Sequence, residues 1–165
     1  MIGKKMNEAF NKQINAEMYS SYLYLAMAAW FESTNLKGFA RWMRVQAQEE
    51  MSHAMKFFDH VVERGGTVGL AEIAAPPDKW DSPLAAFEDA YKHECKVSSL
   101  INNLADLAAG AKDHASGVFL QWFINEQVEE EAAADEIVQK LKMIGEHKGG
   151  LFMLDRALGE RKEGD

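Results

Sequence analysis

Gln46-Ala47-Gln48-Glu49-Glu50-Met51-Ser52-His53-Ala54 sets a carboxylate, Glu50, and an imidazole, His53, three residues apart inside an apolar helical stripe. Residues three and four positions apart share one face of a helix. The other members of this face are apolar: Phe39, Met43, Ala47, Ala54, Phe57 and Val61. Because burying an unpaired carboxylate costs several kcal/mol, roughly, the pattern indicates a positive neighbour. A metal ion is the simplest candidate.

Length and cysteine content indicate a single domain, 1–165, in a reducing compartment. A chain of 165 residues buries a sizeable core without disulfides, and its one cysteine, Cys95, can form no internal bridge. The first residues lack the apolar run of a signal peptide. The longest uncharged apolar stretch, 18–31, is shorter than the ~20 residues that span a bilayer. We therefore expect a soluble cytoplasmic protein with no membrane partner.

The net charge of -8 argues against a nucleic-acid partner, because phosphate binding needs a basic patch. An acidic surface ordinarily serves solubility. A shell that gathers cations would also be acidic.

Turn residues divide the chain into five predicted helices and no strands. The fold class is all-α: a four-helix bundle with one long crossover between helices two and three and a short fifth C-terminal helix. Asn35 is the expected N-cap of the second helix, and Ser82, followed by Pro83, that of the third. The fifth helix is too short to stand alone, so it should dock, for example on copies of itself. The predicted ranges are 6–32, 36–64, 83–109, 113–144 and 150–161.

The connection from Gly65 to Ser82 is unusually long for a compact domain. Extended at ~3.3 Å per residue, it can run the length of a bundle whose helices rise ~1.5 Å per residue. The second and third helices should therefore be parallel. Near 22–31 the first helix is apolar nearly all round, which predicts a core on one side and a subunit contact on the other.

Every long helix carries a polar interruption in its apolar stripe. These are Glu17 on the first helix, Glu94 on the third, and Gln127 with Glu130 on the fourth. In parallel helices Glu50 and Glu94 lie within about 5 Å in height. Four carboxylates and one histidine thus converge, as in di-metal bundles that combine single glutamates with Glu-x-x-His motifs. Such ligands suit iron, although zinc or manganese would also fit.

The chain resembles the prokaryotic non-haem ferritins over essentially its whole length. Together the matching segments are highly specific: 15–24 (Asn-Ala-Glu-Met-Tyr-Ser-Ser-Tyr-Leu-Tyr), 48–53 (Gln-Glu-Glu-Met-Ser-His), 92–94 (Lys-His-Glu), 119–122 (Phe-Leu-Gln-Trp) and 126–131 (Glu-Gln-Val-Glu-Glu-Glu). The resemblance implies a ferritin-like bundle in a homo-oligomeric shell of about 24 subunits. It implies ferroxidase activity on Fe(II) with O2 or peroxide, and storage of the Fe(III) mineral.

Site residues follow from this resemblance by position. Glu17, Glu50 and His53 resemble the ligands of a first iron, and Glu50, Glu94 and Glu130 those of a second, with Glu50 bridging. Gln127 resembles the residue beside the second iron. Tyr24 and Trp122 match aromatic residues near the ferroxidase centre that are candidate electron donors, with core packing as the ordinary alternative.

A second acidic stripe, Glu49, Glu126 and Glu129, lies about 100° round each helix from a site residue. A solvated helix face is the ordinary explanation. The register also resembles a third iron site on the way to the storage cavity.

The other histidines, His60, His93, His114 and His147, lack acidic partners at ligand spacing and are predicted to lie on the surface. Cys95 is predicted to be a small packed thiol.

Three other functions remain open. A haem-containing bacterioferritin also has Glu-Met-x-His, here Met51, but it has a second Glu-x-x-His where this chain has Gln127-x-x-Glu130, so haem is not expected. A non-storage di-iron oxidase or peroxidase would lack a shell. A metal-free interaction protein would leave the buried acids unexplained.

Overall fold

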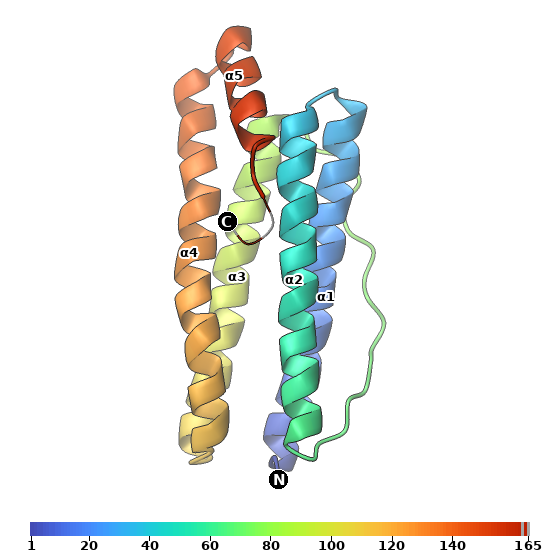
Figure 1. The fold of residues 1–165 in the computed structure, drawn as a ribbon, viewed down its shortest axis with the longest axis vertical. Helices are drawn as coiled ribbons and strands as arrows, with labels where there is room; N and C mark the ends of the chain where they lie inside the picture. The colour runs from blue at the N-terminus through green and yellow to red at the C-terminus, as the bar shows by residue number, and fades with distance from the viewer. Residues whose placement is uncertain (163, 165) are drawn as a thin grey trace.

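Four long helices and one short helix make up the structure, a computed structural model that describes residues 1–162 and 164. Figure 1 shows the long helices side by side, with the short one at one end of the bundle. The predicted all-α fold is confirmed, and no strand occurs among these described residues. Glu163 and Asp165, at the end of the predicted domain, lie outside the description. The helices are α1 (Lys4–Ser33), α2 (Lys37–Glu63), α3 (Pro83–Gly110), α4 (His114–Ile144) and α5 (Lys148–Leu158).

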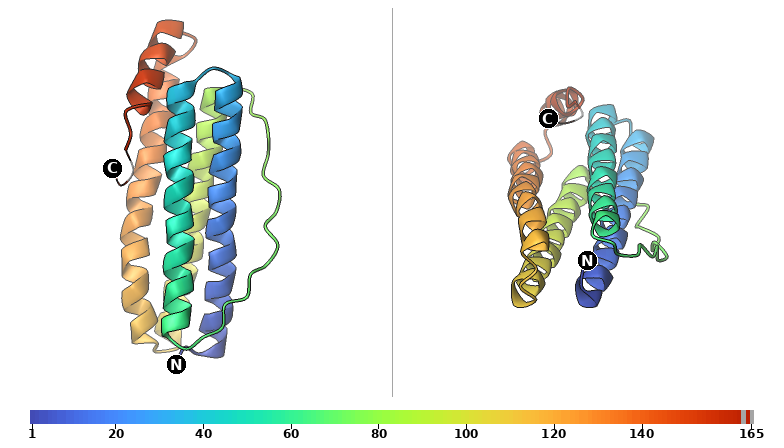
Figure 2. Two further views of the ribbon diagram at one scale, coloured as in Figure 1. Left: turned by 45° about the vertical axis from the view of Figure 1, so that its right-hand side comes forward. Right: turned by 60° about the horizontal axis from the view of Figure 1, so that its bottom comes forward.

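The long crossover returns the chain to the end where α2 began, so α2 and α3 are parallel as predicted (Figure 2). Three asparagines spaced four apart on α1 hold it: Asn7, Asn11 and Asn15 donate to backbone carbonyls of residues 67–72 at 2.9 to 3.1 Å. Residues four apart lie on one helix face, so a single face of α1 guides the crossover.

The apolar core consists of two clusters, one toward each end of the bundle. The first packs Phe31 of α1 against Phe39 of α2 and Phe87 of α3. The second packs Phe10 of α1 against Phe57 of α2. The polar interruptions predicted from the sequence fall between the two clusters on each helix.

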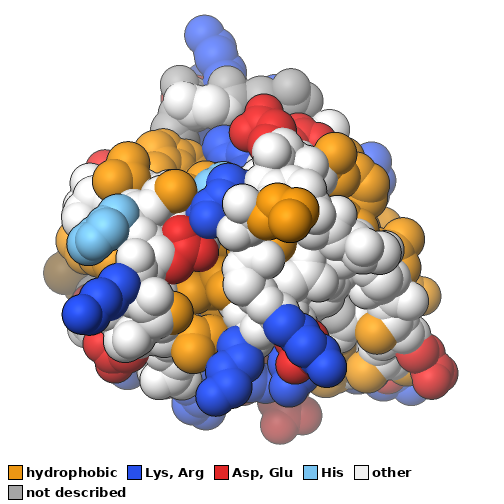
Figure 3. Space-filling model, turned by 90° about the horizontal axis from the view of Figure 1, so that it is seen from below, with side chains coloured by type: hydrophobic (Ala, Val, Ile, Leu, Met, Phe, Trp, Pro, Cys, Tyr) orange, Lys and Arg blue, Asp and Glu red, His pale blue; other side chains and the backbone are white. Residues whose placement is uncertain are grey.

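Side-chain caps begin α3 and α4. Ser82 Oγ accepts from the Ala85 N–H at 3.0 Å, which confirms the predicted cap of α3. Asp113 Oδ1 accepts from the Ser116 N–H at 3.2 Å and pairs with Arg64 at 3.0 Å, which ties the end of α2 to the start of α4. Figure 3 shows this end of the bundle, where acidic and basic side chains lie close together.

The N-terminus of α2 is capped from α5, so the predicted cap, Asn35, is wrong. Asn35 has a φ of 60° and lies in the turn before Leu36, the N-cap residue, which provides no side-chain bond. Asp155 Oδ1 of α5 instead accepts from the N–H groups of Gly38 and Phe39 at 2.9 and 3.1 Å. A carboxylate at this end also interacts favourably with the helix dipole.

The fifth helix docks within its own chain, on α2 and α4. Its Phe152 and Met153 are nevertheless 70% and 73% exposed, so docking on another copy stays a prediction. No helix in the described part of the chain has both the length and the apolar character needed to cross a membrane.

Gly38 is expected to be required for this docking. An added Cβ would lie 1.6 Å from the carbonyl oxygen of Asp155 and 3.0 Å from the nitrogen of Gly159, and backbone atoms cannot move aside as a flexible side chain would. We expect Gly38→Ala to destabilise the protein by about 1–3 kcal/mol and to expose α5 to protease. Denaturant unfolding and limited proteolysis measure the two effects.

Gly117→Ala is the matched control, because a Cβ at this α4 glycine meets nothing within 4 Å. It should be neutral or stabilising by up to about 1 kcal/mol through helix propensity. Equal stability and equal cleavage of the two variants would contradict the role of Gly38.

Candidate metal centre

Six polar side chains are buried together in the middle of the bundle, each no more than 7% exposed. Every long helix contributes at least one of them, because its apolar face is interrupted between the two core clusters. They are Glu17 of α1, Glu50 and His53 of α2, Glu94 of α3, and Gln127 and Glu130 of α4.

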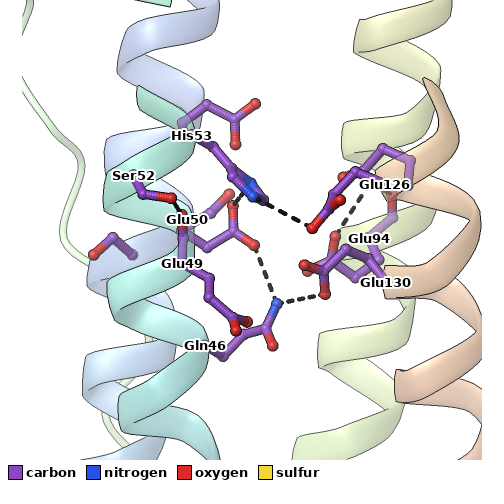
Figure 4. Close-up of polar contacts among 12 residues, drawn as sticks. Gln46, Glu49, Glu50, Ser52, His53, Glu94, Glu126 and Glu130 are labelled. Atoms are coloured by element: carbon purple, nitrogen blue, oxygen red, sulfur yellow. Dashed lines mark hydrogen bonds and ion pairs between the residues drawn. The ribbon is translucent and has the colours of Figure 1, made fainter. Parts of the chain in front are cut away.

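Two groups of potential ligands share Glu50. One joins Glu50 to Glu17 and His53, and the other joins it to Glu94 and Glu130. Within each group the ligand atoms lie within 4.8 Å of one another, which is the spacing of donors around one cation. The structure therefore brings together the residues predicted for the two irons, with Glu50 common to both. Figure 4 shows four of them, Glu50, His53, Glu94 and Glu130.

The amides of Gln13 and Gln46 support three of the carboxylates. Gln13 Nε2 donates to Glu17 Oε1 at 2.7 Å, and Gln46 Nε2 donates to Glu50 Oε1 at 3.2 Å and Glu130 Oε2 at 2.6 Å. Neither glutamine was predicted from the sequence. Each precedes a site glutamate by four residues and so shares its helix face, which is a usable signal.

Glu94 is held from two sides. The Tyr24 hydroxyl donates to its Oε1, and Gln127 Nε2 donates to its Oε2 at 3.2 Å. Glu17 Oε2, in contrast, is buried without a hydrogen-bond partner among the described residues. A buried carboxylate oxygen without a donor is free to bind a cation.

Burial raises the pKa of every carboxyl group in the centre by removing water from the charged form. It raises the pKa of Glu94 and Glu130 to about 7. The pKa values of Glu17 and Glu50 rise well above their ordinary range, through burial and then the neighbouring negative charges. A cation bound among the four would favour their ionised forms. The donor set thus fits a divalent metal.

The two predicted aromatic residues differ in setting. Tyr24 is 1% exposed and touches the centre through Glu94. Trp122 is 39% exposed, so its alternative role in core packing is wrong. Its ring lies 5.4 Å from the His53 ring, and Lys56 Nζ lies 3.7 Å from its centroid. Trp122 therefore lies at the border of the centre, facing solvent.

The acidic stripe lines a cavity of about 490 Å³ between α2 and α4 that reaches His53 and Glu130. Its three members have different contacts. Glu126 lies 3.9 Å from His53 Nε2 and forms a third ligand group with His53 and Glu130. Glu49 pairs with Arg161 at 2.6 Å, and Glu129 is exposed.

The predicted surface positions of His60 and His93 are wrong, whereas His114 and His147 are exposed. His60 stacks on Phe119 with ring centroids 4.0 Å apart. His93 lies between helices, and its Nε2 is 2.7 Å from Ser20 Oγ. Burial lowers the pKa of His93 to about 4. Cys95 is a half-buried free thiol, in keeping with a packed side chain.

A four-helix bundle with two carboxylate-rich groups of potential ligands in its core has the arrangement found in ferritin-like di-metal carboxylate proteins. Residues 7–144 match the ferritin-like domain family. The chain is 47% identical to a bacterial non-heme ferritin of Bacteroides fragilis, over 98% of this chain and 100% of that protein. It is 38% identical to the one of Campylobacter jejuni, over 94% and 93%.

Solved structures agree. The fold matches an open pore ferritin from the hyperthermophilic archaeon Archaeoglobus fulgidus with a TM-score of 0.98 and 57% identity, over 98% of this chain and 100% of that chain. The chain belongs to the ferritin family, which confirms the resemblance seen in its sequence.

Glu94→Gln should stabilise the metal-free protein at neutral and higher pH. Below the ordinary pKa of 4.5, Glu94 is protonated in both the folded and unfolded chain. As the pH rises from there to about 7, the unfolded chain ionises while the folded chain keeps the Glu94 proton, so the fold loses stability, and the loss levels off once the folded group also ionises. Glutamine keeps the volume without the charge, so its advantage should grow from pH 5 to pH 8. Denaturant unfolding in chelator measures this.

A redox-inert divalent ion such as Zn²⁺ completes the test. The parent should gain roughly 2.7 kcal/mol at a hundredfold excess over the dissociation constant, and the variant less. Glu8→Gln, at an exposed position of α1, is the control and should change little at any pH. A Glu94→Gln protein that is less stable than the parent in chelator at pH 8 and gains as much from zinc would refute the repulsive cluster.

Proposed function

We propose that this protein is an iron store with ferroxidase activity, which oxidises Fe(II) in the bundle core and keeps Fe(III) as an oxo-hydroxide mineral inside an oligomeric shell. The observation that carries the proposal is the pair of buried ligand groups that share Glu50. Membership of the ferritin family supports iron storage. We also take residues 1–165 to form one ferritin-like domain.

Iron is the substrate of the proposed site. Glu17, Glu50 and His53 would hold one Fe(II), and Glu50, Glu94 and Glu130 the other, so the bridge keeps the two ions close. Each ion then gives one electron to O2 or peroxide. Carboxylate oxygens are hard ligands and favour the ferric product. Carboxyl groups that hold protons in the metal-free site release them when iron binds.

Two neighbours have supporting roles in this scheme. Tyr24 donates directly to Glu94 and is the better placed of the two candidate electron donors, because the ring of Trp122 packs against His53 and is partly exposed to solvent. Gln127 keeps Glu94 oriented toward the centre.

Product iron would leave through the acidic cavity between α2 and α4. Glu126 shares a ligand group with His53 and Glu130, so it can take up an ion as the ion leaves the second site. Glu49 and Glu129 line the same cavity and would form a third iron site with Glu126. Exposed apolar residues on α1, Tyr22 and Leu25, are available for subunit contacts in a shell of about 24 copies.

Replacing Glu17 or His53 with alanine should slow the initial oxidation of Fe(II) by more than about tenfold, since losing an outer-shell partner alone costs 10–100-fold. The shell should remain assembled, because neither side chain is on the surface. Stopped-flow absorbance and size-exclusion chromatography measure rate and assembly. Glu8→Ala on the same helix is the control for Glu17. If either ligand variant oxidises Fe(II) at the initial rate of the parent protein, the proposed site is wrong.

The iron content after aerobic loading separates storage from a di-iron oxidase or peroxidase. Storage gives far more iron per subunit than the ligands alone can hold, in a particle of shell size. A small particle that retains only a few ions per subunit would favour the oxidase. Haem absorbance in the purified protein would favour bacterioferritin.

The double change of Glu126 and Glu129 to alanine should leave binding of the first two irons intact and slow later turnover; Glu49 is kept because it pairs with Arg161. Its physical reason is that these side chains line the cavity, while Glu17, Glu50 and Glu94 lie in the buried layer. Equilibrium titration with Fe(II) under argon counts the first ions, and repeated aerobic additions follow turnover. Loss of the first two binding events would show that the ligands are divided wrongly.

A further inference from the structure

We propose that Arg161, in the segment after α5, is a positioning residue for the metal centre. It orients the side-chain amide of Gln46, and this amide in turn holds Glu50 and Glu130 in place. The inference rests on the proposed function, because Glu50 and Glu130 are its metal ligands. It gives the C-terminal segment a part in building a site that lies on the four long helices.

The guanidinium of Arg161 is held in one arrangement. Its Nη1 donates to Gln46 Oε1 at 2.9 Å and its Nη2 donates to Glu49 Oε2 at 2.6 Å. Its Cζ lies 4.3 Å from the centroid of the Trp42 ring, and the side chain is only 13% exposed. The Arg161 carbonyl also accepts from Arg41 Nε at 3.1 Å, so backbone and side chain both dock on α2. A planar fork stacked on a ring suits arginine and not lysine.

The amide of Gln46 then has one favourable orientation. Gln46 is 1% exposed, and its nitrogen faces Glu50 Oε1 at 3.2 Å and Glu130 Oε2 at 2.6 Å. A flipped amide would turn its oxygen toward these two carboxylate oxygens and its N–H groups toward the guanidinium donors of Arg161. An oxygen acceptor facing acceptors and donors facing donors form no hydrogen bonds.

Gln46 is therefore a bridge between α2 and α4. Figure 4 shows it below the ligand groups, with bonds to Glu50 of its own helix and to Glu130 of the opposite helix. Metal-ligating carboxylates depend on such outer hydrogen bonds for their orientation, and losing one typically lowers metal affinity 10–100-fold. Without Arg161 the amide could rotate, and the two ligands would lose their common donor.

The direction in which metal affinity changes when Arg161 is removed distinguishes a positioning role from a direct effect of its charge. Arg161 is a cation near a cation site, so by Coulomb's law alone its removal should tighten metal binding. If it acts by orienting Gln46, its removal should weaken binding. Arg156 on α5 is exposed, and Arg156→Ala removes the same charge from the same part of the chain as a matched control.

The experiment is an anaerobic titration of the assembled, metal-free protein with Co²⁺, whose visible absorption reports both affinity and coordination geometry. We expect Arg161→Ala to weaken Co²⁺ binding about tenfold or more and to change the spectrum. Gln46→Ala should also weaken Co²⁺ binding and change the spectrum. The double variant should bind Co²⁺ as tightly as the single variant with the lower affinity, because both changes act through one amide. Arg161→Lys keeps the charge but lacks the planar guanidinium, so it should also bind Co²⁺ more weakly than the parent. This variant replaces Arg161→Ala in the experiment if the alanine variant does not assemble.

Three results would overturn the inference: unchanged or tighter Co²⁺ binding by Arg161→Ala, full affinity in Arg161→Lys, or additive losses in the double variant. An equal loss in Arg156→Ala would show that the loss does not depend on the contact with Gln46 and would overturn it too. Glu50→Ala tests the proposed function separately. If Glu50→Ala loses Co²⁺ while Arg161→Ala keeps it, the site stands and the role of Arg161 fails. If Glu50→Ala binds like the parent, the site itself is wrong.

Discussion

The burial of four carboxyl groups in one layer of the core is the constraint on which the rest of this structure depends. Neutral donors from Gln13, Gln46, Tyr24 and Gln127 satisfy some of their oxygens but supply no positive charge. The layer therefore destabilises the metal-free fold. Two apolar clusters, one on each side, must offset this. Each of the four long helices must therefore extend through one apolar cluster, the polar layer and the other apolar cluster, which requires its length.

The crossover is the second consequence of that layer. Glu50 and Glu94 reach the same height because α2 and α3 run in the same direction, which requires a connection as long as the bundle. Such a connection is entropically costly to order unless it gains contacts along its length. The row of asparagines on α1 supplies them, through backbone carbonyls that would otherwise bond to water. A polar feature of the outer surface thus supports the geometry of the buried site.

Sequence periodicity predicted the helices, their directions and the residues that converge, because helix faces and turn residues are local properties. It failed where a contact joins distant parts of the chain. Asparagine is a common N-cap residue, so Asn35 was the predicted cap, yet Asp155, far along the sequence, accepts the capping hydrogen bonds of α2. His93 looked solvated because its partner, Ser20, lies on another helix. Arg161 carried no signal at all, since an arginine after a short terminal helix is typical of a surface residue.

The C-terminal segment shows why such contacts matter to the site. The family match ends at residue 144, the last residue of α4, so α5 and the residues after it lie outside the matched region. A helix of 11 residues is unstable alone, so α5 is fixed in place by Asp155 at the start of α2 and by close contact with Gly38. From Gly38 to Gln46 is eight residues of α2, a rise of about 12 Å. The six residues from Asp155 to Arg161 reach up to ~20 Å when fully extended, so they can span that distance. The cap of α2 and the amide of Gln46 are thus joined by one short segment, which brings the guanidinium of Arg161 to Gln46.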